Sequence, residues 1–145
     1  MSLIEEGSDM ELSGIRVIKY VVDYNNFATG LVGNDLALAR YADVLLMKAE
    51  ALLRNNRSAE ALMLVNELRL KRGASEWSDL TLSALLDERS RELFWEAHRR
   101  LDLLRFGRYL DEWQQKPADT DNRALLFPIP LSQIGNQNYQ QNPLY

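Results

Sequence analysis

Cysteine is absent from the 145 residues of this chain, and histidine occurs only once, as His98. Without cysteine the chain has no disulfide, no thiolate metal ligand and no cysteine nucleophile. A single histidine leaves few ways to build a zinc site or a histidine-based catalytic triad. We therefore expect no metal and no cofactor.

Long apolar runs are absent too. No stretch reaches the roughly 18 apolar residues that suggest a membrane-spanning helix, and the N-terminus lacks the basic, apolar and small-residue pattern of a signal peptide. The opening Met1-Ser2-Leu3 is typical of a cloning remnant. We therefore interpret the chain as a piece of a longer protein.

The chain also lacks an excess of positive charge. Its 21 acidic and 17 basic residues give a net charge of -4. Nucleic acids and anionic membranes are bound through a surplus of lysine and arginine, so we expect neither as a partner. The length predicts one domain, and 46% hydrophobic residues are enough for one core.

Two helices that form a hairpin are predicted over about residues 40–73. Apolar residues recur there at helical spacing, and Asn55-Asn56 ends the first helix. Ser58 is the expected cap of the second helix, and Gly73 its left-handed stop. Ala49 and Ala61 lie where the helices approach closely, which is typical of a tetratricopeptide-like unit.

A second hairpin is predicted over about 81–115. Thr81 caps its first helix, whose apolar stripe continues through Leu93 and Ala97. A bend near 97–99 then starts another helix that runs toward Trp113. Residues 14–22 predict an extended segment and 23–38 a loop.

The C-terminal residues 118–145 are predicted to be extended. Two prolines in Leu125 to Pro130 exclude a central strand. Leu131 to Ile134 is expected to form one turn, and the tyrosines of the tail favour docking on the body.

The stretch Glu88 to Gly107 mixes charges with large apolar residues, and two interpretations compete. Glu88, Glu92 and Glu96 fall four apart, so on a helix they repel one another unless basic residues offset the charge. One interpretation is a structural ion-pair network, in which Glu88 reaches Arg91 and Asp102 reaches Arg99 or Arg105. The other makes Glu92 and Glu96 an acid/base pair assisted by His98.

Four groups of residues follow one another along the chain: Arg40-Tyr41-Ala42-Asp43-Val44-Leu45-Leu46-Met47 with Ala49-Glu50-Ala51; Asn66, Leu68-Arg69 and Arg72-Gly73; Glu88-Arg89, Arg91-Glu92-Leu93, Glu96, Arg99, Asp102-Leu103 and Arg105; and Pro128-Ile129-Pro130 with Gln141-Asn142-Pro143 and Tyr145. Together with Lys19-Tyr20 they resemble the C-terminal part of the SusD/RagB family, from about residue 14 to the end. Ala97, Phe106 and Leu144 depart conservatively from the usual glycine, tryptophan and glycine of the family.

This resemblance implies a mainly α fold of tetratricopeptide-like helical hairpins with extended, loop-rich N- and C-terminal segments. Residues 1–145 would form a single domain, the C-terminal portion of a SusD-like protein. Family members are non-catalytic surface lipoproteins of the Bacteroidetes outer membrane. They bind a glycan or other nutrient and cover a SusC-like TonB-dependent transporter. Only the lipid anchor of the full-length protein would contact the membrane.

The motifs matched to the family are scaffold motifs, so no ligand residue is carried over from it. Exposed aromatic side chains that stack on sugar faces are the physical candidates for glycan binding. Trp77, in a loop, and Trp113, near a helix end, are the first two, followed by Tyr24 and Phe27. Ordinary packing of these side chains is the alternative interpretation.

Two other functions stay open. One is a helical-repeat scaffold that contacts a transporter and has no ligand site of its own in these residues. The other is a hydrolase that uses Glu92, Glu96 or Asp102. The single histidine and the lack of a glycine-rich phosphate loop or nucleophile elbow argue against it.

Overall fold

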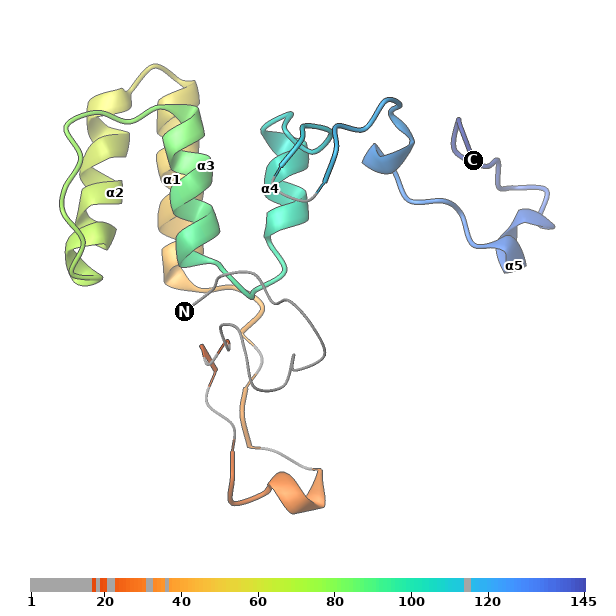
Figure 1. Ribbon diagram of the computed structural model, residues 1–145, viewed down its shortest axis with the longest axis horizontal. Coiled ribbons are helices and arrows are strands. Elements are labelled where there is room, and N and C mark those ends of the chain that lie inside the picture. The colour runs from red at the N-terminus through yellow and green to blue at the C-terminus, as the bar shows by residue number, and fades with distance from the viewer. Residues whose placement is uncertain (1–16, 18, 21–22, 31–32, 36, 114–115) are drawn as a thin grey trace. The chain divides into compact units, whose positions relative to one another are not determined.

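The structure is a computed structural model that describes residues 17–145 except 18, 21–22, 31–32, 36 and 114–115 (Figure 1). Its elements, in chain order, are η1 (Phe27–Thr29), α1 (Tyr41–Arg54), α2 (Ser58–Lys71), α3 (Leu82–Glu92), α4 (Arg99–Arg105), η2 (Arg123–Leu125) and α5 (Leu131–Ile134). Within these described residues the only β pairing is an isolated bridge between Trp113 and Lys116. The predicted mainly α class is confirmed. No described helix is long and apolar enough to cross a bilayer.

The chain divides into two compact units, Met1–Arg40 and Tyr41–Tyr145. In the first unit, the carboxylate of Asp23 closes a loop by accepting hydrogen bonds from the backbone N–H groups of Asn25 (3.1 Å) and Gly33 (2.9 Å). The predicted loop is therefore present. The predicted extended segment 14–22 lies largely outside the described residues, and the single-domain organisation of 1–145 stays a prediction.

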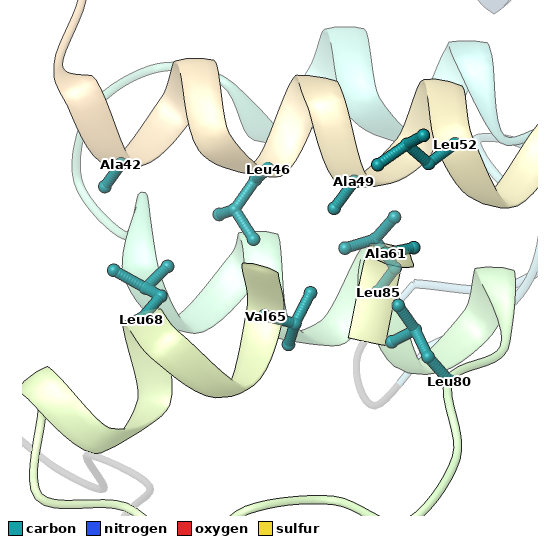
Figure 2. Packing of buried hydrophobic residues seen from close by; sticks show 9 residues of the cluster. All are labelled: Ala42, Leu46, Ala49, Leu52, Ala61, Val65, Leu68, Leu80 and Leu85. Carbon is teal, nitrogen blue, oxygen red and sulfur yellow. The ribbon is translucent and has the colours of Figure 1, made fainter. Parts of the chain in front are cut away.

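Helices α1 and α2 form the predicted hairpin, and its core lies between α1, α2 and α3 (Figure 2). Ala49 and Ala61 are completely buried where the two helices meet, as their small size predicts. Residue 80, from the loop before α3, and the apolar stripes of the helices supply the rest of the cluster: Ala42, Leu46, Leu52, Val65, Leu68, Leu80 and Leu85. Helix α3 packs on α1, so the second pair of helices is joined to the first through α1.

Three helices end in the same hydrogen-bonded motif. After α1, α2 and α4 the residues Asn56, Gly73 and Gly107 have φ of 60°, 70° and 69°. In each case this residue and the next one donate N–H groups to carbonyls in the last helical turn, which is the Schellman arrangement. The predicted stops at Asn55-Asn56 and Gly73 are confirmed. The predicted helix toward Trp113 is wrong, because Gly107 ends α4 at Arg105.

The two predicted N-caps differ in outcome. The Thr81 hydroxyl accepts a hydrogen bond from the Ala84 N–H at 3.1 Å, so this cap is confirmed. Ser58 is instead the first residue of α2, and Arg57 occupies the cap position without a side-chain cap bond. Arg57 already donates its N–H to Leu52 in the motif that ends α1, so α2 starts immediately after it.

The turn between α3 and α4 also differs from the prediction. The apolar stripe predicted α3 to continue through Ala97, but α3 ends at Glu92. Trp95 and Ala97 have φ of 66° and 62°, and left-handed residues cannot continue a right-handed helix. The predicted bend therefore exists, but the chain turns over 93–98 instead of kinking within one helix.

The C-terminal segment is attached to α4 by Arg100. Its guanidinium donates to the Ala124 carbonyl at 3.0 Å and lies 4.0 Å from the ring centroid of Phe127. The tail then returns to this segment, because the Tyr145 hydroxyl lies 3.1 Å from the carbonyl oxygens of Arg123 and Leu126. The single turn α5 is confirmed. The tail docks on the C-terminal segment, and docking of the tail directly on the helices stays a prediction.

Glycine at position 97 should stabilise the protein. Ala97 pays for its left-handed backbone, so we expect Ala97→Gly to raise the free energy of unfolding by about 1 kcal/mol. Urea denaturation followed by circular dichroism measures it. The matched control is Ala51→Gly on the exposed side of α1, which should lower stability by about 1 kcal/mol. A loss of stability in both variants would contradict the assigned backbone at 97.

Candidate functional site

The row of glutamates predicted in 88–96 is held by arginines. Glu88 accepts from Arg69 at 2.7 Å and from Arg91 at 2.8 Å. Glu92 accepts two hydrogen bonds from the guanidinium of Arg72, at 2.9 and 2.7 Å. The expected Glu88–Arg91 pair is thus confirmed, and α2 supplies two further cations that the sequence spacing did not reveal.

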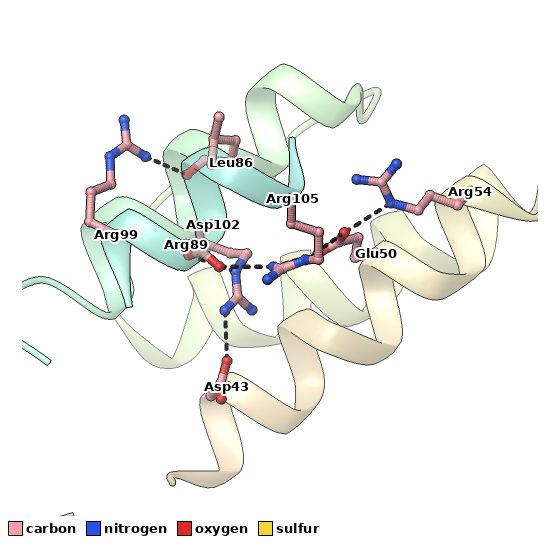
Figure 3. A network of polar contacts seen from close by, with 8 residues as sticks. All are labelled: Asp43, Glu50, Arg54, Leu86, Arg89, Arg99, Asp102 and Arg105. Carbon is pink, nitrogen blue, oxygen red and sulfur yellow. Dashed lines mark hydrogen bonds and ion pairs between the residues drawn. The ribbon is translucent and has the colours of Figure 1, made fainter. Parts of the chain in front are cut away.

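Arg89 lies at the centre of a buried network (Figure 3). It is only 2% exposed. Its Nη2 donates to Asp43 on α1 at 2.8 Å, and its Nε lies 2.9 Å from the carboxylate of Asp102 on α4. Within the described residues its Nη1 is buried without a hydrogen-bond acceptor. The guanidinium of Arg89 on α3 therefore links α1 to α4.

A second arginine extends this network. Arg105 donates to both oxygens of the Glu50 carboxylate, at 3.0 and 2.8 Å, and to Asp102 at 2.8 Å (Figure 3). Glu50 also accepts from Arg54, one turn later on α1, at 2.9 Å. The predicted pair of Asp102 with Arg105 is confirmed. Arg99 instead donates to the Leu86 carbonyl at 3.4 Å.

The network sets the protonation of the buried Glu50 and the partly exposed Arg105. Burial raises the pKa of Glu50, but the hydrogen bonds from Arg105 and Arg54 outweigh it, so the pKa lies below its ordinary value. The hydrogen bonds that Arg105 donates to Glu50 raise the pKa of Arg105. Both groups are therefore held in their charged forms at neutral pH.

These contacts favour the structural interpretation of 88–107 over the acid/base one. Glu92 ends α3 and Glu96 lies in the following turn, so the two do not form the helical row that the sequence suggested. Asp102 is buried between Arg89 and Arg105. Its two carboxylate oxygens are each ion-paired with an arginine, as expected for a structural role.

Trp77 lies in the loop between α2 and α3 and is fixed there by Asn66. The Asn66 amide donates to the Trp77 carbonyl and accepts from the Trp77 N–H, both at 2.9 Å. The half-buried ring packs against the hydrophobic core, and the guanidinium of Arg69 lies 4.1 Å from its centroid. A sugar would have to displace Arg69 to stack on that face.

Trp113 is more open. It is 44% exposed, and it forms the isolated bridge with Lys116, whose ammonium lies 5.3 Å from the ring centroid. In the other unit, Tyr24 is largely exposed beside the loop closed by Asp23. Phe27 begins η1, but its side chain lies outside what the structure describes.

Trp95 is the exposed aromatic residue that sequence reasoning missed. It is 69% exposed, and its ring lies 6.2 Å from that of Phe94. Helical periodicity placed both residues among the apolar members of a buried helix. The signal that could have corrected this was the bend near Ala97, which removes 93–98 from the helix.

The helices, the ion pairs and the C-terminal segment agree with the resemblance seen in the sequence. The sequence model of the SusD family matches residues 2–145. The chain belongs to the SusD family. Its scaffold residues, including Arg89, Asp102 and Arg105, are those that build the buried network.

Three curated SusD proteins are similar to this chain. It is 35% identical to "Starch-binding protein SusD" of Bacteroides thetaiotaomicron over 121 residues, which are 77% of the chain and 22% of that protein. It is 36% identical to "SusD-like protein P25" of Formosa agariphila over 120 residues, 72% of the chain and 22% of the relative. "SusD-like protein P38" of that species is 29% identical over 145 residues, 90% of the chain and 28% of the relative. The chain thus spans about a quarter of these relatives.

Removal of the central guanidinium should destabilise this SusD-family chain strongly. Arg89→Met leaves Asp43 and Asp102 buried without their shared cation, which should cost about 3–5 kcal/mol of unfolding free energy. Chemical denaturation measures the loss. Arg57→Ala, which breaks only the exposed pair with Glu60, is the control and should leave the midpoint unchanged.

A second variant keeps the Arg89 test informative if Arg89→Met does not fold. Arg89→Met combined with Asp43→Leu and Asp102→Leu also removes the two buried carboxylates that Arg89 had neutralised, and it should recover much of the stability. If the triple variant is no more stable than Arg89→Met, the ion pairs are not the cause of the loss.

Glu50 should make stability depend on pH. Because its pKa is lower in the folded state, its contribution is complete above the unfolded pKa of about 4.3 and is lost as pH falls through the folded value. We expect Glu50→Gln to be less stable than the parent at pH 7, with a gap that narrows below about pH 4. Urea midpoints at pH 7, 5, 4 and 3 measure the gap. A gap that is the same at every pH would contradict this assignment.

Proposed function

We propose that this chain is the C-terminal portion of a non-catalytic, glycan- or nutrient-binding protein. What carries the proposal is membership of the SusD family over residues 2–145. A relative at 35% identity is named for starch binding, which makes a polysaccharide the first ligand to test.

The state of the carboxylates supports binding without catalysis. Of the three acidic residues that a hydrolase could have used, Glu92, Glu96 and Asp102, the first and the last are paired with arginines. Within the described residues no group of histidine and acidic side chains is arranged to hold a metal ion. A protein that binds a glycan without cleaving it needs neither an unpaired catalytic carboxylate nor a metal ion.

We also propose the location and partner that the family implies. The full-length protein would be a lipoprotein on the surface of the outer membrane, and it would cover a SusC-like TonB-dependent transporter. The helical hairpins would form part of the body that holds the nutrient above the barrel.

A second candidate role, contact with the transporter without a ligand site, is favoured by one observation. The outer side of α1 exposes Tyr41, Val44 and Met47, which lie on one face of the helix at spacings of three residues. An exposed apolar stripe of this kind is typical of a protein-binding surface. Both roles are compatible, since ligand and transporter would use different surfaces.

Trp113 and Trp77 remain the proposed sugar contacts, and their surroundings predict different results. Trp113→Ala should weaken glycan binding and leave the melting temperature unchanged, because its side chain is 44% exposed and lies beside the ammonium of Lys116. Trp77→Ala should lower the melting temperature, because its ring packs on the core and under Arg69. Calorimetric titration with soluble starch and other polysaccharides, together with thermal melts, measures both effects.

The two roles give different outcomes in this experiment. Binding by the parent chain that is lost in Trp113→Ala supports a ligand site within these residues. A folded parent chain that binds no polysaccharide argues for the scaffold role. Trp113→Ala that binds as tightly as the parent would remove Trp113 from the site.

A further inference from the structure

The turn between α3 and α4 presents two aromatic rings to solvent. Phe94 and Trp95 are both more than half exposed, and their ring planes are tilted by 43°. The preceding residue, Leu93, is buried and anchors the turn to the core. The rings are therefore held at a defined place on the surface and do not belong to a helix face.

A cavity of about 340 Å³ lies beside these rings. Buried Arg89, Leu93 and Asp102 contribute to its lining, together with Ser90, His98 and Arg99. Its volume falls within the range of roughly 300–1,000 Å³ that is usual for small-molecule sites. The cavity thus has room for a small ring and combines apolar with polar walls.

The polar side chains of this cavity are suited to an uncharged ligand. Arg89 and Asp102 are paired with each other, and Asp43 and Arg105 complete their pairing. The buried charges of the cavity wall are thus offset by one another, and the exposed Arg99 at its edge donates to the Leu86 carbonyl at 3.4 Å. Ser90 and His98 contribute a hydroxyl and an imidazole to the lining, and both groups can form hydrogen bonds to the hydroxyl groups of a ligand.

The backbone at Trp95 adds an independent argument. A left-handed conformation costs a non-glycine residue about 1–2 kcal/mol. Glycine at this position would avoid that cost. Because Trp95 is 69% exposed, burial of its side chain offsets little of the cost. Strained residues of this kind occur preferentially at ligand sites, where the conformation serves to present the side chain.

We propose that the cavity at the α3–α4 turn binds one neutral sugar ring of a glycan, stacked on Trp95 and hydrogen-bonded by Ser90 and His98. The inference rests on the proposed glycan-binding function and names a contact other than Trp77 and Trp113. An aromatic face beside hydroxyl-binding side chains matches a sugar, which has an apolar face and a polar rim.

Trp95→Gly tests the site with little risk to folding. Glycine accepts the left-handed backbone at 95, so the variant should be at least as stable as the parent. We expect its dissociation constant for a neutral oligosaccharide to rise about tenfold, and that of Trp95→Phe to rise less because a ring remains. Calorimetry with maltoheptaose, cellohexaose and mannohexaose measures the change, and trigalacturonate serves as the charged comparison.

Each outcome of this test bears on the inference. Weaker binding by Trp95→Gly at unchanged stability, with full binding by the exposed-surface control Met63→Ala on α2, supports it. Undiminished binding by Trp95→Gly, together with lost binding by Trp113→Ala, overturns the inference and leaves the proposed function intact. Tighter binding of trigalacturonate than of the neutral sugars overturns the assigned ligand class. A folded parent chain that binds none of the four overturns the inference, and the proposed function is then decided by the wider polysaccharide titration.

Discussion

The structure depends on one buried positive charge. Arg89 is removed from water, and a charge in that position is tolerated only if nearby carboxylates neutralise it. Asp43 on α1, which precedes Arg89 in the sequence, and Asp102 on α4, which follows it, both do so. The positions of three helices are thus linked, because a shift of α1 or α4 would separate a buried ion from its partner. Arg105 and Glu50 extend the same constraint toward the surface.

Features that depend on neighbouring residues could be predicted from the sequence. The α1–α2 hairpin follows from helical periodicity, from small residues at 49 and 61, and from Asn56 and Gly73, which favour left-handed backbone. The Thr81 cap and the single turn α5 are local in the same sense. The family could also be recognised, because its motifs are residues in a fixed order along the chain and can be read without knowing which contacts they make.

Features that depend on partners far away in the sequence could not be predicted. Spacing along the chain pairs Asp102 with Arg99 or Arg105, but nothing local reveals that Arg89 reaches Asp43, 46 residues away. The exposure of the tryptophan side chains could not be predicted from the sequence either. From the sequence Trp77 is expected to be an exposed loop residue, but Asn66 and Arg69 hold it in place. Trp95 is expected to be a core residue, but α3 ends at Glu92 and leaves it exposed. Helical periodicity does not predict that two residues after α3 have a left-handed backbone.

The pairing of Gln141 with Ile129 has a consequence for association between chains. An extended segment with free backbone groups is a template on which another strand can add. Pro128 and Pro130 have no N–H, so Ile129 carries the one backbone donor between them. The Gln141 side chain accepts from that N–H at 2.9 Å and donates to the Ile129 carbonyl at 3.1 Å. An amide side chain thereby occupies the place of a neighbouring strand, and this edge is closed to sheet-like aggregation.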